Sequence, residues 1–287
     1  MKISKSKSEG HINGIHKSSS AEYPLISVIT VVFNGEKYIE QTILSVINQT
    51  YKNIEYIIID GASTDGTCDI IKNYEDKIAY WISEPDKGIY YAMNKGIMAV
   101  NDKNSYILFL NADDYLYGNS SIERIVSKIK NEDFIYGKIL SIGNSTSVLL
   151  GKELTLDQLS VSMIQHQSTF VKKRLFDDLG IFNSSYKIAA DFDFAIRVMK
   201  SKFSKQFINE IVAVMRMGGA GSKNYQITFR EKSQIISCHY KGFNKIKALL
   251  YFNLYEMPKY FLSNLLSHLG LLRLFRRCKK SLYTIQS

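Results

Sequence analysis

The stretch LISVITVVFNGEKYIEQTILSVINQTYKNIEYIIID, residues 25–60, decides the fold. Residues 25–33 form a continuous apolar run rich in β-branched side chains, and residues 54–60 form a second such run. Between the two runs, apolar residues recur at the three- and four-residue spacing of one helix face. Strands that are apolar along their whole length and are joined through a helix predict a parallel sheet covered by helices.

The same alternation continues beyond residue 60. Residues 78–83 and 106–110 read as further apolar strands, and residues 68–76 and 88–100 read as helices between them. The connections are short, as in units of strand, helix and parallel strand. The sequence therefore predicts an α/β fold, Rossmann-like, with a mainly parallel central sheet flanked by helices.

The net charge of +10 is concentrated at the two ends of the chain. Residues 1–20 carry four Lys against one Glu, and residues 241–287 carry nine Lys or Arg against one Glu. The part between them is close to neutral, whereas a nucleic-acid enzyme carries its basic stripe on the folded domain. We therefore expect no nucleic-acid partner.

The N-terminus and the cysteines bear on the compartment. The first 20 residues are polar and lack the apolar core of a secretory signal, so we expect a disordered basic tail. The three cysteines are isolated in the sequence, which implies neither a zinc site nor a disulfide framework. Both observations favour the cytoplasm.

Polar residues follow three of the predicted strands. Asn34 follows the first strand, Asp60 ends the second, and residues 111–114 (Asn-Ala-Asp-Asp) follow the fourth. Each cluster alone is typical of a turn. Because ligands bind outside the carboxyl ends of strands in such sheets, all three together favour a site. No GxGxxG follows the first strand and no GxxxxGK[ST] occurs, which disfavours a dinucleotide oxidoreductase and a Walker-type NTPase.

Adjacent carboxylates at Asp113 and Asp114 repel each other where the fourth strand emerges. A hard divalent cation would neutralise them, because Mg²⁺ and Mn²⁺ prefer carboxylate and phosphate oxygens. The pair therefore indicates Mn²⁺ or Mg²⁺ held against a diphosphate.

Several segments, in this order, resemble the family 2 glycosyltransferases, a GT-A group that builds bacterial polysaccharides. They are ISVITVVFNGEKYIEQTILSVINQTYKNIEYIIIDGASTDGT, SEPDKGIYYAMNKGI, YILFLNADD, HQSTFVKKRLFDDLGIF and AADFDFAIRV. The resemblance covers roughly residues 25–222 and rests on the order and spacing of the motifs. It implies a GT-A catalytic domain at 24–222 (nucleotide-sugar half 24–118, acceptor half 119–222). The composition of the remaining chain predicts the disordered basic tail at 1–23 and a helical extension at 223–287.

The resemblance implies donor contacts at the strand ends. Asp60 matches the family's first aspartate after the second strand, which contacts the donor base or ribose. Asn111 stands in place of the first Asp of the family's DxD motif, so that Asp113 is implied as the metal ligand and Asp114 as the second. Gly61 and Tyr91 depart from the Asp that many relatives have. The implied donor-binding residues are Phe33, Asn34, Asp60, Asp86, Asn94, Asn111 and Ala112.

On the acceptor side, Asp191 aligns with the catalytic base of the family. From the residues alone, Asp191 is more typical of a helix N-cap than of a catalytic base. Asp193 and Arg197 are four residues apart, which predicts an ion pair on one helix face. We expect acceptor contacts from His166 and Gln167, although a lone His is more often structural. A mobile loop at Gly218, Gly219 and Ser222 resembles the family's GGxS loop, the alternative being an ordinary linker.

Residues 223–287 predict a basic amphipathic extension. Apolar residues recur every three to four positions, Pro258 should kink the helix, and a basic cluster follows at 273–280. No apolar run of about 18 residues occurs, which disfavours a membrane span. We expect residues 241–287 to lie on an anionic membrane, at the inner face of the plasma membrane. The alternative is packing against the catalytic domain or a partner subunit.

The sequence thus predicts a metal-dependent inverting glycosyltransferase that moves a hexosyl or N-acetylhexosaminyl group from a nucleotide sugar, with UDP expected, to a hydroxyl of a glycan or lipid-linked acceptor in cell-surface polysaccharide synthesis. A sugar-nucleotide nucleotidyltransferase would want a basic Gly-rich loop after the first strand, and a dehalogenase-type phosphatase would need Asp-x-Asp there. A silent glycan- or nucleotide-binding subunit is suggested by Asn111 and Tyr91. Retention of Asp60, Asp113 and Asp191 argues against it.

Overall fold

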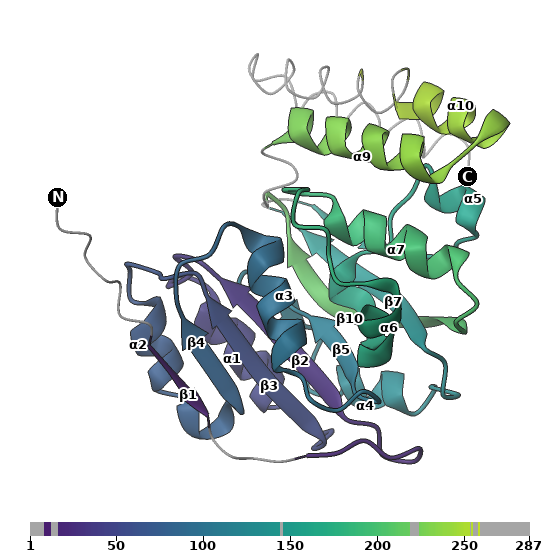
Figure 1. The fold of residues 1–287 in the computed structure, drawn as a ribbon. Helices are drawn as coiled ribbons and strands as arrows, with labels where there is room; N and C mark the ends of the chain where they lie inside the picture. Colours follow the sequence, from purple (N-terminus) through teal and green to yellow (C-terminus); the bar gives the residue numbers. More distant parts are fainter. Residues whose placement is uncertain are drawn as a thin grey trace, which may run out of the picture. The chain divides into compact units, whose positions relative to one another are not determined.

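The computed structural model describes residues 9–12, 17–143, 146–218 and 224–252, together with residues 254 and 258. The chain divides into two compact units, residues 1–228 and 229–287. The first unit is built on one mixed sheet, and the described part of the second is helical (Figure 1). The predicted boundary at 222/223 stays a prediction.

The N-terminal half of the sheet confirms the predicted alternation. Its elements, in chain order, are β2 (Ile26–Val32), α1 (Ile39–Ile47), β3 (Ile54–Asp60), α2 (Thr67–Lys72), the short helix η1 (Glu75–Lys77), β4 (Tyr80–Ser83), α3 (Ile89–Ala99) and β5 (Tyr106–Phe109). The strands lie in the order β4-β3-β2-β5, and each neighbouring pair is parallel. Their carboxyl ends therefore meet at one edge.

Helices cover both faces of this half, which is why its strands are apolar throughout. All seven residues of β2 are buried. In Figure 1, α3 crosses in front of the strands and α1 lies behind them. The α1 side chains Ile39 and Ile43 join the same core cluster as Val28 of β2. On α3, a Cβ at Gly96 would lie 2.4 Å from Ile29 Cγ2, so the close approach of this helix requires glycine.

The C-terminal half of the sheet is mixed. Beyond β5 the order is β9-β7-β10-β6; β7 and β10 are parallel, the other neighbours are antiparallel, and β8 pairs with β7. The elements are β6 (Tyr115–Leu116), α4 (Ser121–Val126), β7 (Phe134–Ile142), β8 (Ser147–Leu150), α5 (Leu156–Leu159), the short helix η2 (His166–Ser168), β9 (Thr169–Lys172), α6 (Lys173–Leu179), α7 (Ala190–Lys200) and β10 (Lys205–Arg216).

The prediction of a disordered tail up to residue 23 is wrong for the described part of that segment. Residues Glu9–Ile12 form β1, which pairs antiparallel with β4. The ammonium group of Lys17 donates to the carbonyls of Lys52 (2.9 Å) and Ile54 (2.7 Å). The physical reason is that β4 would otherwise present an unpaired sheet edge, which an added strand satisfies.

The helical region comprises α9 (Tyr225–His239), which crosses the boundary between the units, and α10 (Gly242–Tyr251). On α10, Phe243, Ile246 and Leu250 are exposed while Ala248 is buried. Within the described residues, no helix has the length and hydropathy needed to cross a membrane. The predicted basic cluster at 273–280 lies outside the described residues.

Candidate active site

The loops after β2 and β3 are tied together by Asn34. Its backbone has φ 50°, a left-handed conformation that Asn tolerates better than most residues. The Asn34 N–H donates to Ser63 Oγ at 2.7 Å, and its side-chain oxygen accepts from the N–H of Thr64 at 2.9 Å. The residue predicted to bind the donor therefore also fixes the loop beside the carboxyl end of β3.

The Asp60 carboxylate holds the loop after β3 through hydrogen bonds from that loop. The residue is completely buried, and its carboxylate accepts from the Ser63 N–H (2.9 Å), from Ser63 Oγ (2.5 Å) and from Ser83 Oγ (2.6 Å). These donors compensate the desolvation of the carboxylate. A direct contact between Asp60 and the donor stays a prediction.

Phe33, Gly61 and Asp86 meet at the end of β3. A Cβ at Gly61 would lie 2.8 Å from Asp86 Oδ2 and 3.5 Å from Phe33 Cδ2. The glycine that departs from the relatives' Asp thus leaves room for Asp86. The Phe33 side chain is 66% exposed, so its ring offers a face on which a planar base could stack.

Asn94, also predicted to bind the donor, has a different partner. Its amide donates to the Phe182 carbonyl at 2.9 Å and accepts from the Phe182 N–H at 3.1 Å. Both polar groups of the buried side chain are thereby used to hold the backbone at residue 182. The contact joins α3 to the segment that precedes α7.

At the carboxyl end of β5, the adjacent carboxylates of Asp113 and Asp114 have different surroundings. No described residue hydrogen bonds to or ion pairs with the Asp113 carboxylate, whereas Asp114 is buried. Asp114 accepts from Gln167 Nε2 at 2.8 Å and from the Arg216 N–H at 3.2 Å. Burial, and secondly the charge of Asp113, raise the pKa of Asp114 to about 7, against the effect of the Gln167 hydrogen bond.

Asp114 and Gln167 therefore already have partners within the protein, which are each other and, for Asp114, the Arg216 N–H. The roles of Asp114 as second metal ligand and of Gln167 as acceptor contact stay predictions. Ala112 is buried at the same turn, and its carbonyl accepts from Thr42 Oγ1 at 2.8 Å. This bond anchors the turn to α1.

The residues at this turn fit a divalent cation with few protein ligands. No group of three or more His, Cys, Asp or Glu that could hold a metal occurs among the described residues. Asp113 offers one carboxylate, which has no hydrogen bond or ion pair with the described part of the chain. Mg²⁺ and Mn²⁺ are commonly held by one or two carboxylates together with substrate phosphates and water.

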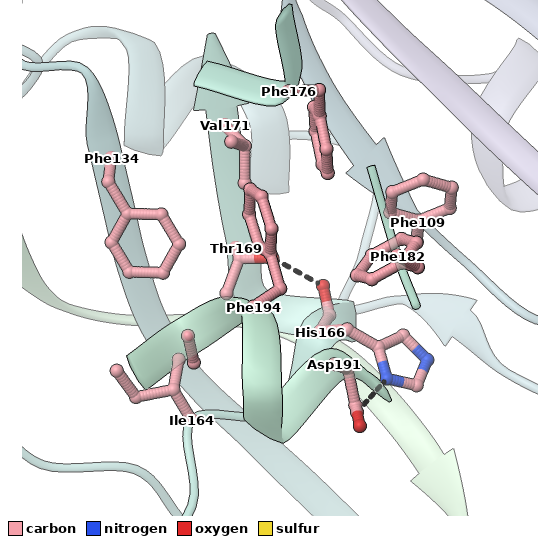
Figure 2. Close-up of a pocket in the computed structure, with 11 residues that line it drawn as sticks. Phe109, Phe134, Ile164, His166, Thr169, Val171, Phe176, Phe182, Asp191 and Phe194 are labelled. Carbon is pink, nitrogen blue, oxygen red and sulfur yellow. Dashed lines mark hydrogen bonds and ion pairs between the residues drawn. The ribbon is translucent and has the colours of Figure 1, made fainter. Parts of the chain in front are cut away.

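Asp191 lies in the first turn of α7, after an N-cap at Ala189, so the interpretation of Asp191 as the N-cap is wrong. Its Oδ1 accepts from the Phe192 N–H (2.9 Å) and lies 2.9 Å from the Tyr90 hydroxyl, which also lies 2.6 Å from the Ile188 carbonyl. Its Oδ2 lies 3.0 Å from His166 Nδ1 (Figure 2). The carboxylate is thus contacted from α3, from α7 and from η2.

Two consecutive residues of η2 connect the two sides of the site. His166 contacts Asp191 through Nδ1 and the Asn111 amide nitrogen through Nε2, at 3.2 Å. Gln167 reaches Asp114. The structure therefore brings together the end of β5 and the start of α7, far apart in the sequence.

A small pocket opens beside His166 and Asp191 (Figure 2). Apart from these two residues and Thr169, its walls are apolar, and five of its side chains are Phe: Phe109, Phe134, Phe176, Phe182 and Phe194. Phe176 and Phe194 stack with ring centroids 4.3 Å apart. Because apolar walls exclude water, the hydrogen bonds to Asp191 form in a low-dielectric environment and are strengthened.

Sequence reasoning missed Tyr90 and Arg216. Tyr90 is a buried neighbour of Asp191, and the doubled Tyr at 90–91 was the available signal. Arg216 ends β10; its guanidinium donates to the Asp113 carbonyl and to Gln41 Oε1. A cation placed directly before the Gly-rich loop was its signal.

The predicted ion pair between Asp193 and Arg197 is confirmed at 2.9 Å. Gly218 has φ +103°, a left-handed conformation that favours glycine at the exit of β10. Gly219 and Ser222, the other residues of the predicted mobile loop, lie outside the described residues.

Comparisons with known proteins identify the family of this chain. The model of "Glycosyl transferase family 2" matches residues 27–189. A PGL/p-HBAD biosynthesis glycosyltransferase of Mycobacterium bovis is 32% identical over 61% of this chain and 69% of its own. An uncharacterized glycosyltransferase of Rickettsia typhi is 31% identical over 77% of this chain and 72% of its own. The chain belongs to glycosyl transferase family 2, and its class is that of a glycosyltransferase.

Solved structures share the fold at low sequence identity. The mannosyltransferase PcManGT from Pyrobaculum calidifontis, in complex with GDP-Man and Mn²⁺, has a TM-score of 0.63 at 14% identity and covers 96% of this chain and 85% of its own. S. aureus TarS 1–349, in complex with UDP-GlcNAc, has a TM-score of 0.61 at 19% identity and covers 79% and 71%. These neighbours are GT-A glycosyltransferases, which confirms the predicted fold class.

Proposed function

We propose that the protein is a metal-dependent inverting glycosyltransferase that uses a nucleotide-sugar donor and a hydroxyl acceptor. The observation that carries the proposal is the convergence of Asp113, Asn111, His166 and Asp191 at the carboxyl edge of the sheet. The Asp113 carboxylate has no hydrogen bond or ion pair among the described residues, and Asp191 is buried beside a pocket. These are the two carboxylates that such a transfer needs, one toward the leaving group and one toward the nucleophile.

In the proposed reaction Asp191 acts as general base. It takes the proton of the acceptor hydroxyl while the hydroxyl oxygen forms a bond to the anomeric carbon of the donor sugar. The bond from that carbon to the diphosphate oxygen breaks, and the electron pair leaves with the nucleoside diphosphate. Attack opposite the leaving group inverts the anomeric configuration, an outcome that the family resemblance also implies.

Asp113 is the residue we propose to hold the cation, Mn²⁺ or Mg²⁺, together with donor diphosphate oxygens. A bound divalent cation supplies charge neutralisation for the leaving diphosphate. The PcManGT complex contains Mn²⁺ and supports this choice of metal, through the likeness of its fold to that of this chain alone.

UDP is the nucleotide we propose, supported by the UDP-GlcNAc complex of TarS; the GDP-Man complex of PcManGT makes GDP the first alternative. For the transferred sugar we propose a hexosyl or N-acetylhexosaminyl group, with the same two complexes as support. For the acceptor we propose a glycan or lipid-linked hydroxyl in cell-surface polysaccharide synthesis.

A thermal-shift panel of UDP, GDP, CDP and dTDP sugars, each with Mn²⁺ or with EDTA, tests the donor site. One nucleotide class should stabilise the protein only with metal, by about 2.7 kcal/mol at a donor concentration about 100 times its Kd. Asp113→Asn should lose the metal-dependent part of this shift. Asp191→Asn should keep it, yet its transfer rate should fall by about 10²- to 10⁴-fold, the usual contribution of a general base.

Asp69→Asn is the matched control, because the Asp69 side chain is 87% exposed on α2. It should change neither the shift nor the rate. Donor binding without transfer to any acceptor would favour a silent binding subunit, whereas release of pyrophosphate from a nucleoside triphosphate and a sugar phosphate would favour a nucleotidyltransferase. Full turnover by Asp191→Asn would refute the assignment of the base.

We further propose that residues 241–287 contact an anionic membrane and place the enzyme at the inner face of the plasma membrane. The support among the described residues is α10, which exposes Phe243, Ile246 and Leu250 beside Lys241, Lys245 and Lys247. Exposed apolar side chains flanked by Lys suit an interface of acyl chains and anionic headgroups.

A further inference from the structure

His166 makes two hydrogen bonds through its two ring nitrogens. Nδ1 lies 3.0 Å from Asp191 Oδ2, and Nε2 lies 3.2 Å from the Asn111 amide nitrogen. The His166 side chain is 16% exposed and that of Asp191 is 7% exposed. The imidazole is therefore held between the residue at the DxD position and the proposed base.

The hydrogen-bond roles of Asp191, His166 and Asn111 determine one another. The Asp191 carboxylate can only accept, so Nδ1 must carry a hydrogen. The Asn111 NH₂ group can only donate, so Nε2 must present its lone pair. Both contacts are satisfied by the neutral imidazole that is protonated on Nδ1. A carboxylate at position 111 can only accept, so that Nε2 would have to donate to it.

Asn111 has a second polar atom, Oδ1, beyond the NH₂ group that contacts His166. With its NH₂ group turned to His166, Asn111 leaves Oδ1 buried, and this oxygen accepts no hydrogen bond from the described residues. A buried carbonyl oxygen without a hydrogen-bond donor has lost its contact with water and gained none in return, which destabilises it. A hydroxyl of the bound nucleotide sugar would supply the missing donor.

We infer that Asn111 and His166 are positioning residues: Asn111 fixes the ring of His166 as the neutral Nδ1–H form, and His166 thereby orients the Asp191 carboxylate toward the acceptor. This inference rests on the proposed function and deepens it. It gives a role to the Asn that replaces the first Asp of the DxD motif, and it makes His166 a partner of the base in place of an acceptor contact. A hydrogen bond from donor hydroxyl to Asn111 would link donor binding to the geometry of the base.

Isosteric variants of His166 separate the two ring nitrogens. Asn places its amide nitrogen near the position of Nδ1, and Gln places its amide nitrogen near that of Nε2. His166→Asn should keep the donor to Asp191 and stay within about threefold of the wild-type kcat, while His166→Gln and His166→Ala should lose about 10- to 100-fold, the scale of a misplaced catalytic group. The KM for the nucleotide-sugar donor should stay within about twofold in all three variants. The reason is that none of them removes a contact that binds the donor equally in the ground state and in the transition state.

His239→Gln is the control, since His239, in α9, is not one of the residues of the proposed site. It should leave kcat and KM unchanged. Equal losses in His166→Asn and His166→Ala would overturn the inference. So would a raised KM for the acceptor at unchanged kcat, which would make His166 an acceptor-binding residue.

A spectroscopic readout keeps the inference testable without turnover. In metal-free protein labelled with ¹⁵N-histidine, the ring-nitrogen shifts of His166 should report protonated Nδ1 and bare Nε2. Asn111→Asp should shift Nε2 to the protonated value. An Nε2–H tautomer in the wild type, or shifts that Asn111→Asp leaves unchanged, would refute the inference even if the wild type transferred sugar. Correct shifts in a protein that transfers no sugar would refute the proposed function alone.

Discussion

The role of Asn111 differs between its interpretation from the sequence and its contacts in the structure. Against the DxD motif, Asn111 reads as a lost metal ligand, and it supported the interpretation of the protein as a silent subunit. In the structure its amide contacts His166, which contacts Asp191. The sequence could mark all three residues through the resemblance. It could not predict their contacts, because hydrogen bonds between residues 55 and 25 positions apart depend on tertiary packing.

Asp114 makes stability depend on pH in the metal-free protein. Folding raises the pKa of its carboxyl from 3.8 to about 7. Between these values the folded state binds a proton that the unfolded state lacks, so the free energy of unfolding falls as pH rises. The stabilisation is fully present below about pH 4 and is lost as pH passes about 7. The slope reaches at most about 1.4 kcal/mol per pH unit.

Asp114→Asn removes this titration. In EDTA, urea unfolding of wild type and variant should therefore diverge between about pH 4 and pH 7, with the wild type losing stability relative to the variant. Asp157→Asn, on the short helix α5, is a control for the loss of one carboxylate. Parallel profiles for wild type and Asp114→Asn would show that Asp114 titrates at an ordinary pKa.

At the scale of elements, β10 ends at the point where the proposed site begins. The Arg216 N–H donates to Asp114, and its guanidinium donates to the Asp113 carbonyl. The guanidinium carbon lies 4.5 Å from the ring centroid of Tyr38 and 5.0 Å from that of Tyr115. Arg216 thus connects β10 to the turn after β5, and it packs against the rings of Tyr38, the N-cap residue of α1, and Tyr115 of β6.

Replacing Arg216 should loosen that turn. Arg216→Met keeps an unbranched apolar side chain but loses two hydrogen bonds and the cation–π contacts, a loss of about 1–3 kcal/mol in the free energy of unfolding. Because the Asp113 backbone is then less fixed, metal-dependent donor affinity should fall about tenfold. Urea unfolding and donor titrations with Mn²⁺ measure the two effects.

Arg124→Met is a suitable comparison, because Arg124 ion pairs with Glu210 away from the turn after β5. It should leave donor affinity unchanged. If Arg216→Met bound donor as tightly as Arg124→Met, β10 would have no part in shaping the donor site.

The two halves of the sheet differ in how far the sequence predicts them. In β2, β3, β4 and β5 the pattern is local, since each strand is a short apolar run bounded by turns and each crossover is a helix. β7 and β10 are neighbours although more than sixty residues separate them, and β10 has register shifts between Phe207 and Ala213. The spacing of apolar residues within one strand does not determine which distant strand it pairs with. The sequence prediction missed β1 for the same reason, because β1 is a strand through its pairing with β4.

For the whole molecule, the distribution of charge remains the main guide to location. Residues 21–240 are close to neutral, whereas residues 241–287 are strongly basic. The described part of this region has Lys241, Lys245 and Lys247 next to the exposed apolar residues of α10. A surface of this kind gains from both the headgroup charge and the acyl boundary of a bilayer.

Sedimentation with vesicles tests this placement on the full chain. Wild type should bind phosphatidylglycerol vesicles and not phosphatidylcholine vesicles, with binding weakened by salt. Joint replacement Lys241→Gln, Lys245→Gln and Lys247→Gln should cost about 3 kcal/mol, at about 1 kcal/mol per Lys, or roughly a hundredfold in partitioning. The control joins Lys77→Gln, Lys87→Gln and Lys130→Gln, which change net charge equally at exposed positions of the first unit. Equal losses in both variants would assign binding to overall charge, and no binding by the wild type would contradict the membrane proposal.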